Sequence, residues 1–550
     1  MQTQSQSQSS RSDSVVRSAG IVSIAVASSR VTGLIREIIL AAMFGAGAVF
    51  DAFRIGFTIP NLTRDLFAEG ALSAAFVPIF TKYLASKPRE EAQVLANLVA
   101  TALIVVVGTI CVLGILLSPQ LVQMVAPGFH ETPGKFELAV LMTRIMFPFL
   151  LLVALAAQAM GILNACSQFG VPAMASTFFN IGSIISGLLI GRVLGPWIGV
   201  TPIEGMAYGV VLGGLMQLLW QVPSLHRAGF HFRPQFNWSH PGLLQILGLM
   251  GPAILGNAAV QINVTVNNNF ASRLADPNGP VSWLGYAFRF MQLPLGIFGV
   301  AIASATLPAI SRSVANNDFD DFRRTLSRSL GLVFLLTIPS AVGLAVLGDS
   351  LVGAVYQMGA FNSFDTHQTA RALACYAIGL VGYAATKVLN PAFYALHDAR
   401  TPMLISFGSI AVNFFTVLML LRVAGFGHEG LALSTSAVAV FSSLALFLVM
   451  RKRIGGIHGR DLWKSFMQVS VASLMMGVAV WVCHQWGVNT FGTSKIARVI
   501  DLAISIPVGL AVLYLSCKLL RVAELDMTMR AVAGPLQRRI PFLRARISKQ

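Results

Sequence analysis

Apolar segments, each long enough to cross a bilayer, follow one another along almost the whole chain of 550 residues. A membrane-spanning helix needs roughly 20 mainly apolar residues, and the sequence contains 14 such segments separated by turn or charge signals. Only 11% of the residues are charged and 55% are hydrophobic, whereas soluble domains carry about 25% charged residues. The sequence therefore predicts an all-α polytopic membrane protein with 14 transmembrane helices. The expected spans are 17–45, 50–84, 92–118, 137–164, 171–195, 204–225, 242–272, 281–311, 322–347, 366–396, 402–424, 429–450, 464–485 and 497–520.

The 39 Lys and Arg residues are unevenly distributed between alternate loops. With a cytoplasmic N-terminus, 25 of them lie on the inner side, 6 lie in outer loops and 8 lie inside spans. Membrane proteins keep Lys and Arg in cytoplasmic loops, so this ratio predicts that both termini are cytoplasmic. The formal net charge of +17 then requires no nucleic acid as a partner. The basic tail from Lys518 either lies on anionic membrane lipids or only fixes the topology.

Short motifs recur at an offset near 230 residues, which indicates an internal repeat. Ala-Ala-Phe-Val-Pro78 corresponds to Ser-Ala-Thr-Leu-Pro308, and the segment that begins at Pro172 corresponds to the one that begins at Pro402. Each repeat holds six spans, an even number, so the two copies have the same orientation. We therefore expect two six-helix lobes plus two extra C-terminal helices, as in transporters that alternate access by rocking lobes. A static bundle that arose by gene duplication is the alternative.

The expected domain boundaries follow from this repeat. They are a disordered cytoplasmic leader (1–16), a first lobe with spans 1–6 (17–225), a second lobe with spans 7–12 (242–450), the extra helix pair (464–520) and a basic cytoplasmic tail (521–550).

Eight basic side chains lie inside the expected spans, where each costs about 2.5–3.5 kcal/mol at the bilayer centre. They are Arg30, Arg36, Arg54, Arg64, Arg144, Arg289, Arg371 and Lys387. Four of the eight fall in the first two spans, and Arg289 lies in the eighth. A guanidinium group can bind two phosphate oxygens at once, and it stays protonated. Arg30, Arg36, Arg64 and Arg289 in one polar cavity would therefore form a receptor for a multiply charged anion.

Local ion pairs are the alternative explanation for these charges. Arg36 would pair with Glu37, Arg64 with Asp65 or Glu69, and Arg30 with Asp51. This alternative fails for Arg289, because 281–311 contains no acid. Three other bases, Arg144, Arg371 and Lys387, are expected to be structural or to lie near a membrane interface, and no role is assigned to Arg54.

The sequence contains no recognisable catalytic or metal-binding motif. HExxH, GxSxG and phosphate-loop patterns are missing, and the five cysteines show no CxxC spacing. We therefore predict neither catalytic residues nor a metal site or cofactor, and expect transport to be driven by a coupling ion or the membrane potential.

The first two spans carry motifs that resemble those of the MurJ (MviN) lipid II flippases. These motifs are Ser29-Arg30-Val-Thr-Gly33-Leu-Ile-Arg36-Glu37, Phe44-Gly45-Ala-Gly47, Asp51-Ala-Phe53, Ile59-Pro60-Asn61-Leu-Thr-Arg64, and Phe67-Ala-Glu69-Gly70-Ala71 leading to Ala75-Phe-Val-Pro78. Further similarities are Ala126-Pro127-Gly128-Phe129, Gly251-Pro252-Ala253-Ile254-Leu255-Gly256, and Arg289 with Pro294 and Gly296. The resemblance extends over essentially the whole chain.

This resemblance implies a fold of 14 helices in the MATE-like (MOP) superfamily, with a cationic central cavity and a lipid groove formed by the extra helix pair. It implies that lipid II, an undecaprenyl-diphosphate-linked peptidoglycan precursor, crosses the bacterial inner membrane by alternating access, for cell wall synthesis. The family's substrate-binding arginines carry over to Arg30, Arg36, Arg64 and Arg289, and its gating acids to Asp51 and Glu69. The chain departs from some relatives in having no carboxylate in 242–272 for a coupling ion.

Three other functions compete with this interpretation. A flippase for another polyprenyl-diphosphate oligosaccharide would bind the same diphosphate. A MATE-type ion-coupled exporter of cationic drugs would need an acidic cavity, which the excess of arginine disfavours. A membrane scaffold would depend on the basic tail.

Overall fold

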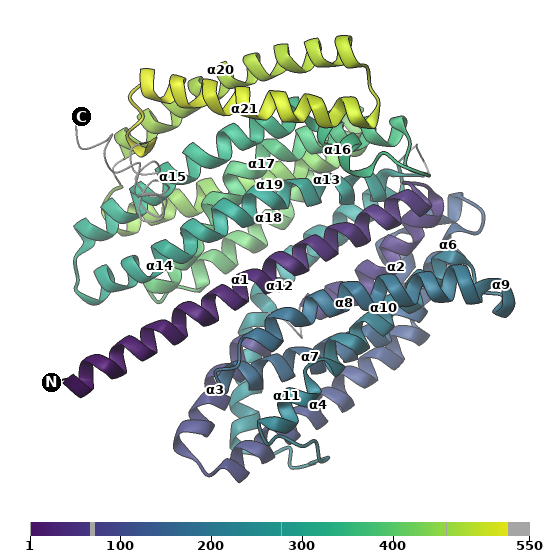
Figure 1. Ribbon diagram of the computed structural model, residues 1–550, viewed down its shortest axis with the longest axis vertical. Helices are drawn as coiled ribbons and strands as arrows, with labels where there is room; N and C mark the ends of the chain where they lie inside the picture. The colour runs from purple at the N-terminus through teal and green to yellow at the C-terminus, as the bar shows by residue number, and fades with distance from the viewer. Residues whose placement is uncertain (1, 66–71, 275, 277, 458, 526–550) are drawn as a thin grey trace. The chain divides into compact units, whose positions relative to one another are not determined.

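The protein is predominantly helical in the part of the chain that the structure, a computed structural model, describes (Figure 1). That part comprises residues 2–65, 72–274, 276, 278–457 and 459–525, with side chains described from residue 22 onward except at positions 74, 252 and 253. Within these ranges no strand is present. Glu69, which the sequence suggested as a gating residue, lies outside the described residues.

The chain divides into two compact units. The first comprises Met1–Ser282 and Met358–Phe361, and the second comprises Trp283–Gln357 and Asn362–Gln550. The helices that begin in the first unit are α1 (Gln2–Phe44), α2 (Ala48–Arg64), α3 (Ser73–Ser86), α4 (Arg89–Leu116), α5 (Ser118–Val125), α6 (Lys135–Met146), α7 (Pro148–Ala165), α8 (Gly170–Leu188), α9 (Gly195–Ile198), α10 (Pro202–Leu219), α11 (Val222–Arg227), α12 (Pro241–Ser272) and α13 (Pro280–Pro294). The helices of the second unit that follow are α14 (Val300–Ala315), α15 (Phe319–Val346), α16 (Gly348–Tyr356), α17 (Ser363–Ala395), α18 (Arg400–Leu418), α19 (His428–Arg453), α20 (Gly459–Phe491) and α21 (Lys495–Leu519).

The repeat seen in the sequence recurs in the helix boundaries. Helices α4 and α15 begin and end 230 residues apart, and so do α8 and α18. Each of α8 and α18 is followed at once by a wider π-helical turn, which starts at Leu189 in one copy and at Met419 in the other. The turns before these helices also correspond, because Ser167 and His397 adopt left-handed φ angles of 61° and 57°. The lobe boundaries expected from the sequence stay a prediction.

Small residues allow the closest helix packing in the first unit. A Cβ atom added to Gly205 of α10 would lie 2.3 Å from the Cα atom of Gly191, which follows α8. Small-residue interfaces of this kind are typical of membrane helices, whose backbones approach closely without a hydrophobic driving force. On the other side of the unit, Phe76 and Phe80 of α3 stack at 4.9 Å and pack against α4 and α7.

Eleven helical segments are long and apolar enough to cross a membrane, or twelve if the bent helix α12 is counted as one span. They match the expected spans 3–6 and 8–14, and α12 matches span 7. In the described part of the chain, α1, α2 and α3 do not pass this test; α2 and α3 have only 17 and 14 residues. The total of 14 spans therefore stays a prediction.

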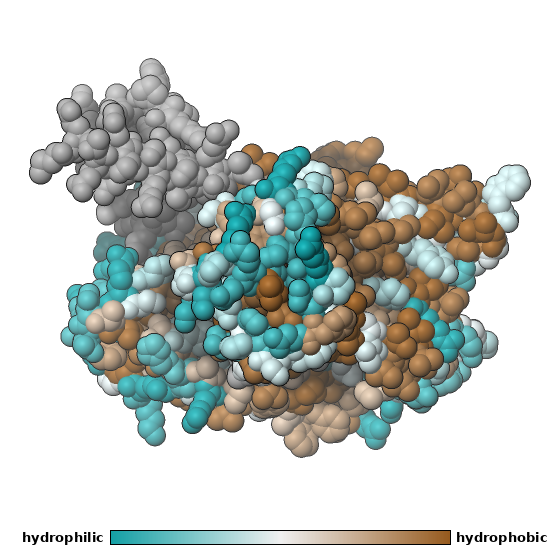
Figure 2. Space-filling view, turned by 90° about the horizontal axis from the view of Figure 1, so that it is seen from below, coloured by the Kyte–Doolittle hydropathy of each residue, from teal (hydrophilic) through white to brown (hydrophobic). Residues whose placement is uncertain are grey.

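Much of the protein's exposed surface is apolar. Figure 2 shows broad areas of apolar side chains beside patches of polar ones. Large apolar side chains such as Trp197, Val423 and Ile496 are among the most exposed. Exposed apolar surface on this scale is expected of helices that face lipid.

Candidate functional site

Helix α1 presents two of the predicted arginines beside α8. Asn180 of α8 donates hydrogen bonds to the Ser29 carbonyl at 3.2 Å and to the Thr32 hydroxyl at 3.3 Å. Gly33 packs against this amide, since a Cβ atom there would lie 3.4 Å from its nitrogen, an ordinary van der Waals distance. These contacts fix the part of α1 that carries Arg30 to the rest of the first unit.

Arg36 is largely buried, with 11% of its side chain exposed. Its guanidinium lies 3.3 Å from the carboxylate of Glu37 and 5.1 Å from the ring centre of Phe179 on α8. The local pair with Glu37 that the sequence offered as an alternative is therefore present. The aromatic face stabilises the cation and holds the guanidinium against α8.

Arg30 has an exposed side chain, and no ion pair or side-chain hydrogen bond joins it to another described residue. The alternative pair between Arg30 and Asp51 is wrong, because Asp51 has other partners. Among the described residues, Arg30 thus differs from Arg36 in having no acidic partner.

Arg64 ends α2 and is paired with its neighbour. Its Nε and Nη2 atoms donate to the same carboxylate oxygen of Asp65 at 3.2 and 2.9 Å, and Gln261 of α12 donates to the other oxygen at 3.4 Å. The side chains of Arg64 and Asp65 are 23% and 34% exposed. The sequence offered an Arg64–Asp65 ion pair as an alternative to substrate binding, and this pair is present. Both side chains are partly exposed.

Asp51 is fully buried in the first turn of α2 and binds four donors. The Lys135 ammonium lies 2.9 Å away, the backbone amides of Gly279 and Ser282 donate at 2.8 and 2.9 Å, and the Ser282 hydroxyl donates at 2.5 Å. Asp51 thus holds the start of α13, which continues from the first unit into the second. Sequence reasoning missed Lys135, which is one of the six bases expected in outer loops. Nothing in the spacing of 84 residues between the two could have identified the pair.

Arg289 lies on α13 in the second unit and is exposed. The helix around it is fixed by Trp283, whose indole donates to Asp365 at 2.9 Å, and by Phe288, which packs edge to face on Tyr376. The structure brings Arg30, Arg36 and Arg64 into one unit and places Arg289 in the other. Their convergence on a single cavity stays a prediction.

The other intramembrane bases have separate partners or exposed positions. Arg371 of α17 pairs with Glu429 of α19 at 2.6 Å, as expected of a structural residue. Arg54 donates to the Ser282 carbonyl at 3.4 Å, beside the Asp51 cluster. Arg144 and Lys387 are exposed.

A second buried polar cluster, around Asp501 of α21, was not identified from the sequence. The Asp501 carboxylate accepts hydrogen bonds from Ser350 of α16 at 2.5 Å and from Ser505 at 2.9 Å, and His484 of α20 lies 2.7 Å from it. A carboxylate inside an otherwise apolar span was the signal that could have revealed this cluster. It joins α20 and α21 to α16.

Asp398 lies in the turn between α17 and α18, outside the membrane-spanning segments. Burial raises the pKa of its carboxyl group, but hydrogen bonds from the Thr401 hydroxyl and amide and the charge of Arg453 outweigh burial, so that the pKa is lowered overall. This carboxylate therefore ties the start of α18 to the end of α19. In the part of the chain that the structure describes, no group of three or more His, Cys, Asp or Glu residues could hold a metal ion.

The sequence and the fold are similar to those of known membrane transporters. A sequence model of the family described as "Lipid II flippase MurJ" matches residues 40–500. A protein named lipid II flippase MurJ from Burkholderia cenocepacia is 35% identical over 478 residues, which cover 86% of this chain and 90% of the relative.

Solved structures show the same relationship. One described as lipid II flippase MurJ in an inward closed conformation superposes with a TM-score of 0.75 at 26% identity, covering 90% of this chain and 98% of the other. An inward-facing MATE multidrug transporter of the MOP superfamily superposes with a TM-score of 0.63 over 77% of this chain and 98% of the other. Its identity of 14% shows the shared fold alone. The predicted all-α membrane architecture is thus confirmed, and its fold is shared with MATE transporters.

Proposed function

Because this chain belongs to the lipid II flippase MurJ family, we propose that it moves lipid II from the inner to the outer leaflet of the bacterial cytoplasmic membrane for cell wall synthesis. The family match over residues 40–500 carries this proposal, and the intramembrane arginines of α1 and α2 support it. The protein acts as a transporter and catalyses no covalent step.

The diphosphate of the substrate binds the arginines of the first unit. Arg36 is desolvated against Phe179, and a guanidinium in such surroundings attracts an anion more strongly than one in bulk water. The exposed Arg30 makes the first contact with the diphosphate. Arg64 then gives up one of its two hydrogen bonds to Asp65 and donates to a phosphate oxygen instead. Arg289 of the second unit supplies a further guanidinium for the diphosphate.

Alternating access moves the headgroup while the polyprenyl tail stays in lipid beside α20 and α21. Both termini are cytoplasmic, which the excess of Lys and Arg in the inner loops supports. A coupling ion or the membrane potential drives the cycle, and the basic tail lies on anionic lipids. Asp51 and Glu69 contribute to the outer gate, Asp51 by holding the start of α13.

A depletion strain tests this function. Loss of the protein should make lipid II accumulate in the cytoplasmic leaflet, as measured by a membrane-impermeant reagent that labels only outward-facing lipid II. Arg36→Ala should fail to restore outward lipid II, and Lys452→Gln, at an exposed base on α19, should restore it fully. Normal labelling in the depleted cells would contradict the proposal.

Two alternative functions can be distinguished by the molecule that the protein transports. A flippase for another polyprenyl-diphosphate oligosaccharide would cause that lipid, and not lipid II, to accumulate. A MATE-type exporter would change the efflux of cationic drugs without changing the leaflet distribution of lipid II.

A further inference from the structure

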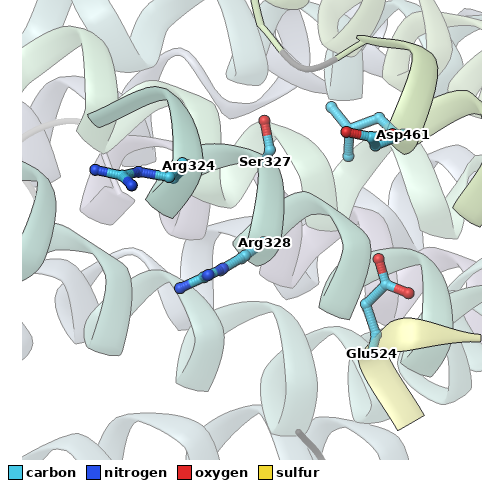
Figure 3. A pocket seen from close by; sticks show the side chains of 6 residues that line it. Arg324, Ser327, Arg328, Asp461 and Glu524 are labelled. Carbon is cyan, nitrogen blue, oxygen red and sulfur yellow. The ribbon is translucent and has the colours of Figure 1, made fainter. Parts of the chain in front are cut away.

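A pocket of about 220 Å³ in the second unit is lined by charges of both signs. Its lining residues are Arg324, Ser327 and Arg328 of α15, Asp461 and Leu462 of α20, and Glu524 after α21. Figure 3 shows the two guanidinium groups on one side of Ser327 and the two carboxylates on the other. This volume is several times the roughly 30 Å³ of one water molecule, so the pocket has room for a polar group much larger than a single ion.

The basic side can bind a phosphate. Arg324 and Arg328 are four residues apart and therefore lie on the same face of α15. Both are exposed, and in the described part of the chain neither forms an ion pair. The Ser327 hydroxyl between them is buried without a hydrogen-bond partner among the described residues. Two guanidinium groups and one hydroxyl supply the donors that phosphate oxygens accept.

The acidic side can bind an ammonium group. Asp461 is exposed at the start of α20 and forms no ion pair with a described residue. Glu524 is seated against Gly331 of α15, where a Cβ atom would lie 2.4 Å from its Oε1 atom. A side chain at position 331 would shift this carboxylate from its present place.

The pocket lies where the membrane interface is expected. Helix α15 changes from charged residues at its start to an apolar run from Leu330. Trp463, next to the lining residue Leu462, is 63% exposed, and exposed tryptophans gather at the level of lipid headgroups. In the repeat, the positions of Arg324 and Arg328 correspond at offset 230 to Val94 and Leu98 of α4, so only the second copy carries this arginine pair.

We propose that this pocket binds the phosphoethanolamine headgroup of a membrane phospholipid, with the phosphate on Arg324 and Arg328 and the ammonium on Asp461 and Glu524. This site goes beyond the proposed transport of lipid II and does not depend on it. A headgroup without an ammonium, such as phosphatidylglycerol, brings no positive group to the carboxylates of Asp461 and Glu524. The trimethylammonium of phosphatidylcholine cannot donate a hydrogen bond to them.

Native mass spectrometry of the purified full-length protein tests the site. Phosphatidylethanolamine, phosphatidylglycerol and phosphatidylcholine with identical acyl chains are added separately. We expect phosphatidylethanolamine to bind about tenfold more tightly than the other two, a factor equal to one charge-assisted hydrogen bond. Asp461→Asn should remove this preference, whereas Arg328→Gln should weaken both phosphatidylethanolamine and phosphatidylglycerol.

Matched variants and a soluble ligand complete the test. Glu90→Gln in the first turn of α4 and Lys452→Gln at the end of α19 change exposed charges elsewhere and should leave the preference unchanged. Equal affinities for the three lipids, or an unchanged preference in Asp461→Asn, would overturn the proposal.

Free phosphoethanolamine should compete with the lipid only at much higher concentration. If it binds as tightly as the lipid, the ligand is a soluble metabolite and the proposed lipid site is wrong.

Discussion

The carboxylate of Asp51 and the ammonium of Lys135 form an ion pair of 2.9 Å in which the two side chains are only 1% and 2% exposed. Two backbone amides and a hydroxyl from the start of α13 complete the set of donors. A carboxylate with this many fixed partners is held in one geometry. Asp51 therefore positions the start of α13.

Breaking this pair should destabilise the protein. Removing one partner of a buried ion pair leaves an uncompensated charge and costs about 3–5 kcal/mol. We expect Asp51→Asn and Lys135→Met each to lower the melting temperature in detergent, and the double variant to lower it by less than the sum of the two. If Asp51→Asn abolishes export at an unchanged melting temperature, the carboxylate acts directly on the substrate or the gate.

Arg36 should require its planar guanidinium and not only its charge. Lys retains the charge but binds phosphate as a point charge without the two-pronged geometry. Arg36→Lys should therefore weaken binding of a polyprenyl diphosphate about tenfold or more, because a hydrogen bond to a charged group contributes about 1.5–3 kcal/mol. Fluorescence titration of the purified protein measures this affinity, with Lys452→Gln as the control. Equal affinities in Arg36→Lys and the unmodified protein would place the diphosphate elsewhere.

The turn between α17 and α18 should make stability depend on pH. The lowered pKa of Asp398 means that its carboxylate stabilises the fold above the pKa of the unfolded chain, and this stabilisation is lost as the pH falls through the folded-state pKa. Asp398→Asn should lower the melting temperature at neutral pH and flatten its decline in acid. Glu90→Gln, at an exposed carboxylate, should retain the decline. If the melting temperature of Asp398→Asn declines in acid as much as that of the unmodified protein, Asp398 is not the source of the pH dependence.

The Asp501 cluster should hold α20 and α21 to α16. Asp501→Ala removes the acceptor shared by Ser350, Ser505 and His484, leaving three polar side chains without this partner. Hydrogen exchange should increase in α16, α20 and α21 while α17 remains protected. Thr490→Val, at an exposed position near the end of α20, is the control. A uniform increase in hydrogen exchange across the second unit would show that the cluster contributes only to global stability.

The sequence was sufficient to predict the segments whose boundaries depend on local chemistry. The expected span 92–118 became Arg89–Leu116 and the expected span 497–520 became Lys495–Leu519, because long apolar runs ended by polar turns define both. The expected second span, 50–84, stays a prediction. There α2 ends at Arg64 and α3 begins at Ser73, and residues 66–71 lie outside the described part of the chain.

Contacts between neighbours in the sequence were also predictable, and distant ones were not. The pairs Arg36–Glu37 and Arg64–Asp65 join adjacent residues, whereas Asp51–Lys135 and Ser350–Asp501 depend on how helices far apart in the chain pack. Spacing cannot identify such partners, because burial and direction are set only by the assembled bundle. For the same reason, the sequence alone could not predict the pocket between α15, α20 and Glu524.

Reconstitution into vesicles tests the central claim most directly. Lipid II is placed in both leaflets of vesicles with and without the purified protein, and a membrane-impermeant reagent measures how much becomes accessible over time. We predict that access beyond the initial outer-leaflet fraction requires the protein and is lost in Arg36→Ala but kept in Lys452→Gln. Equal access with and without the protein, or with Arg36→Ala and the unmodified chain, would contradict the account.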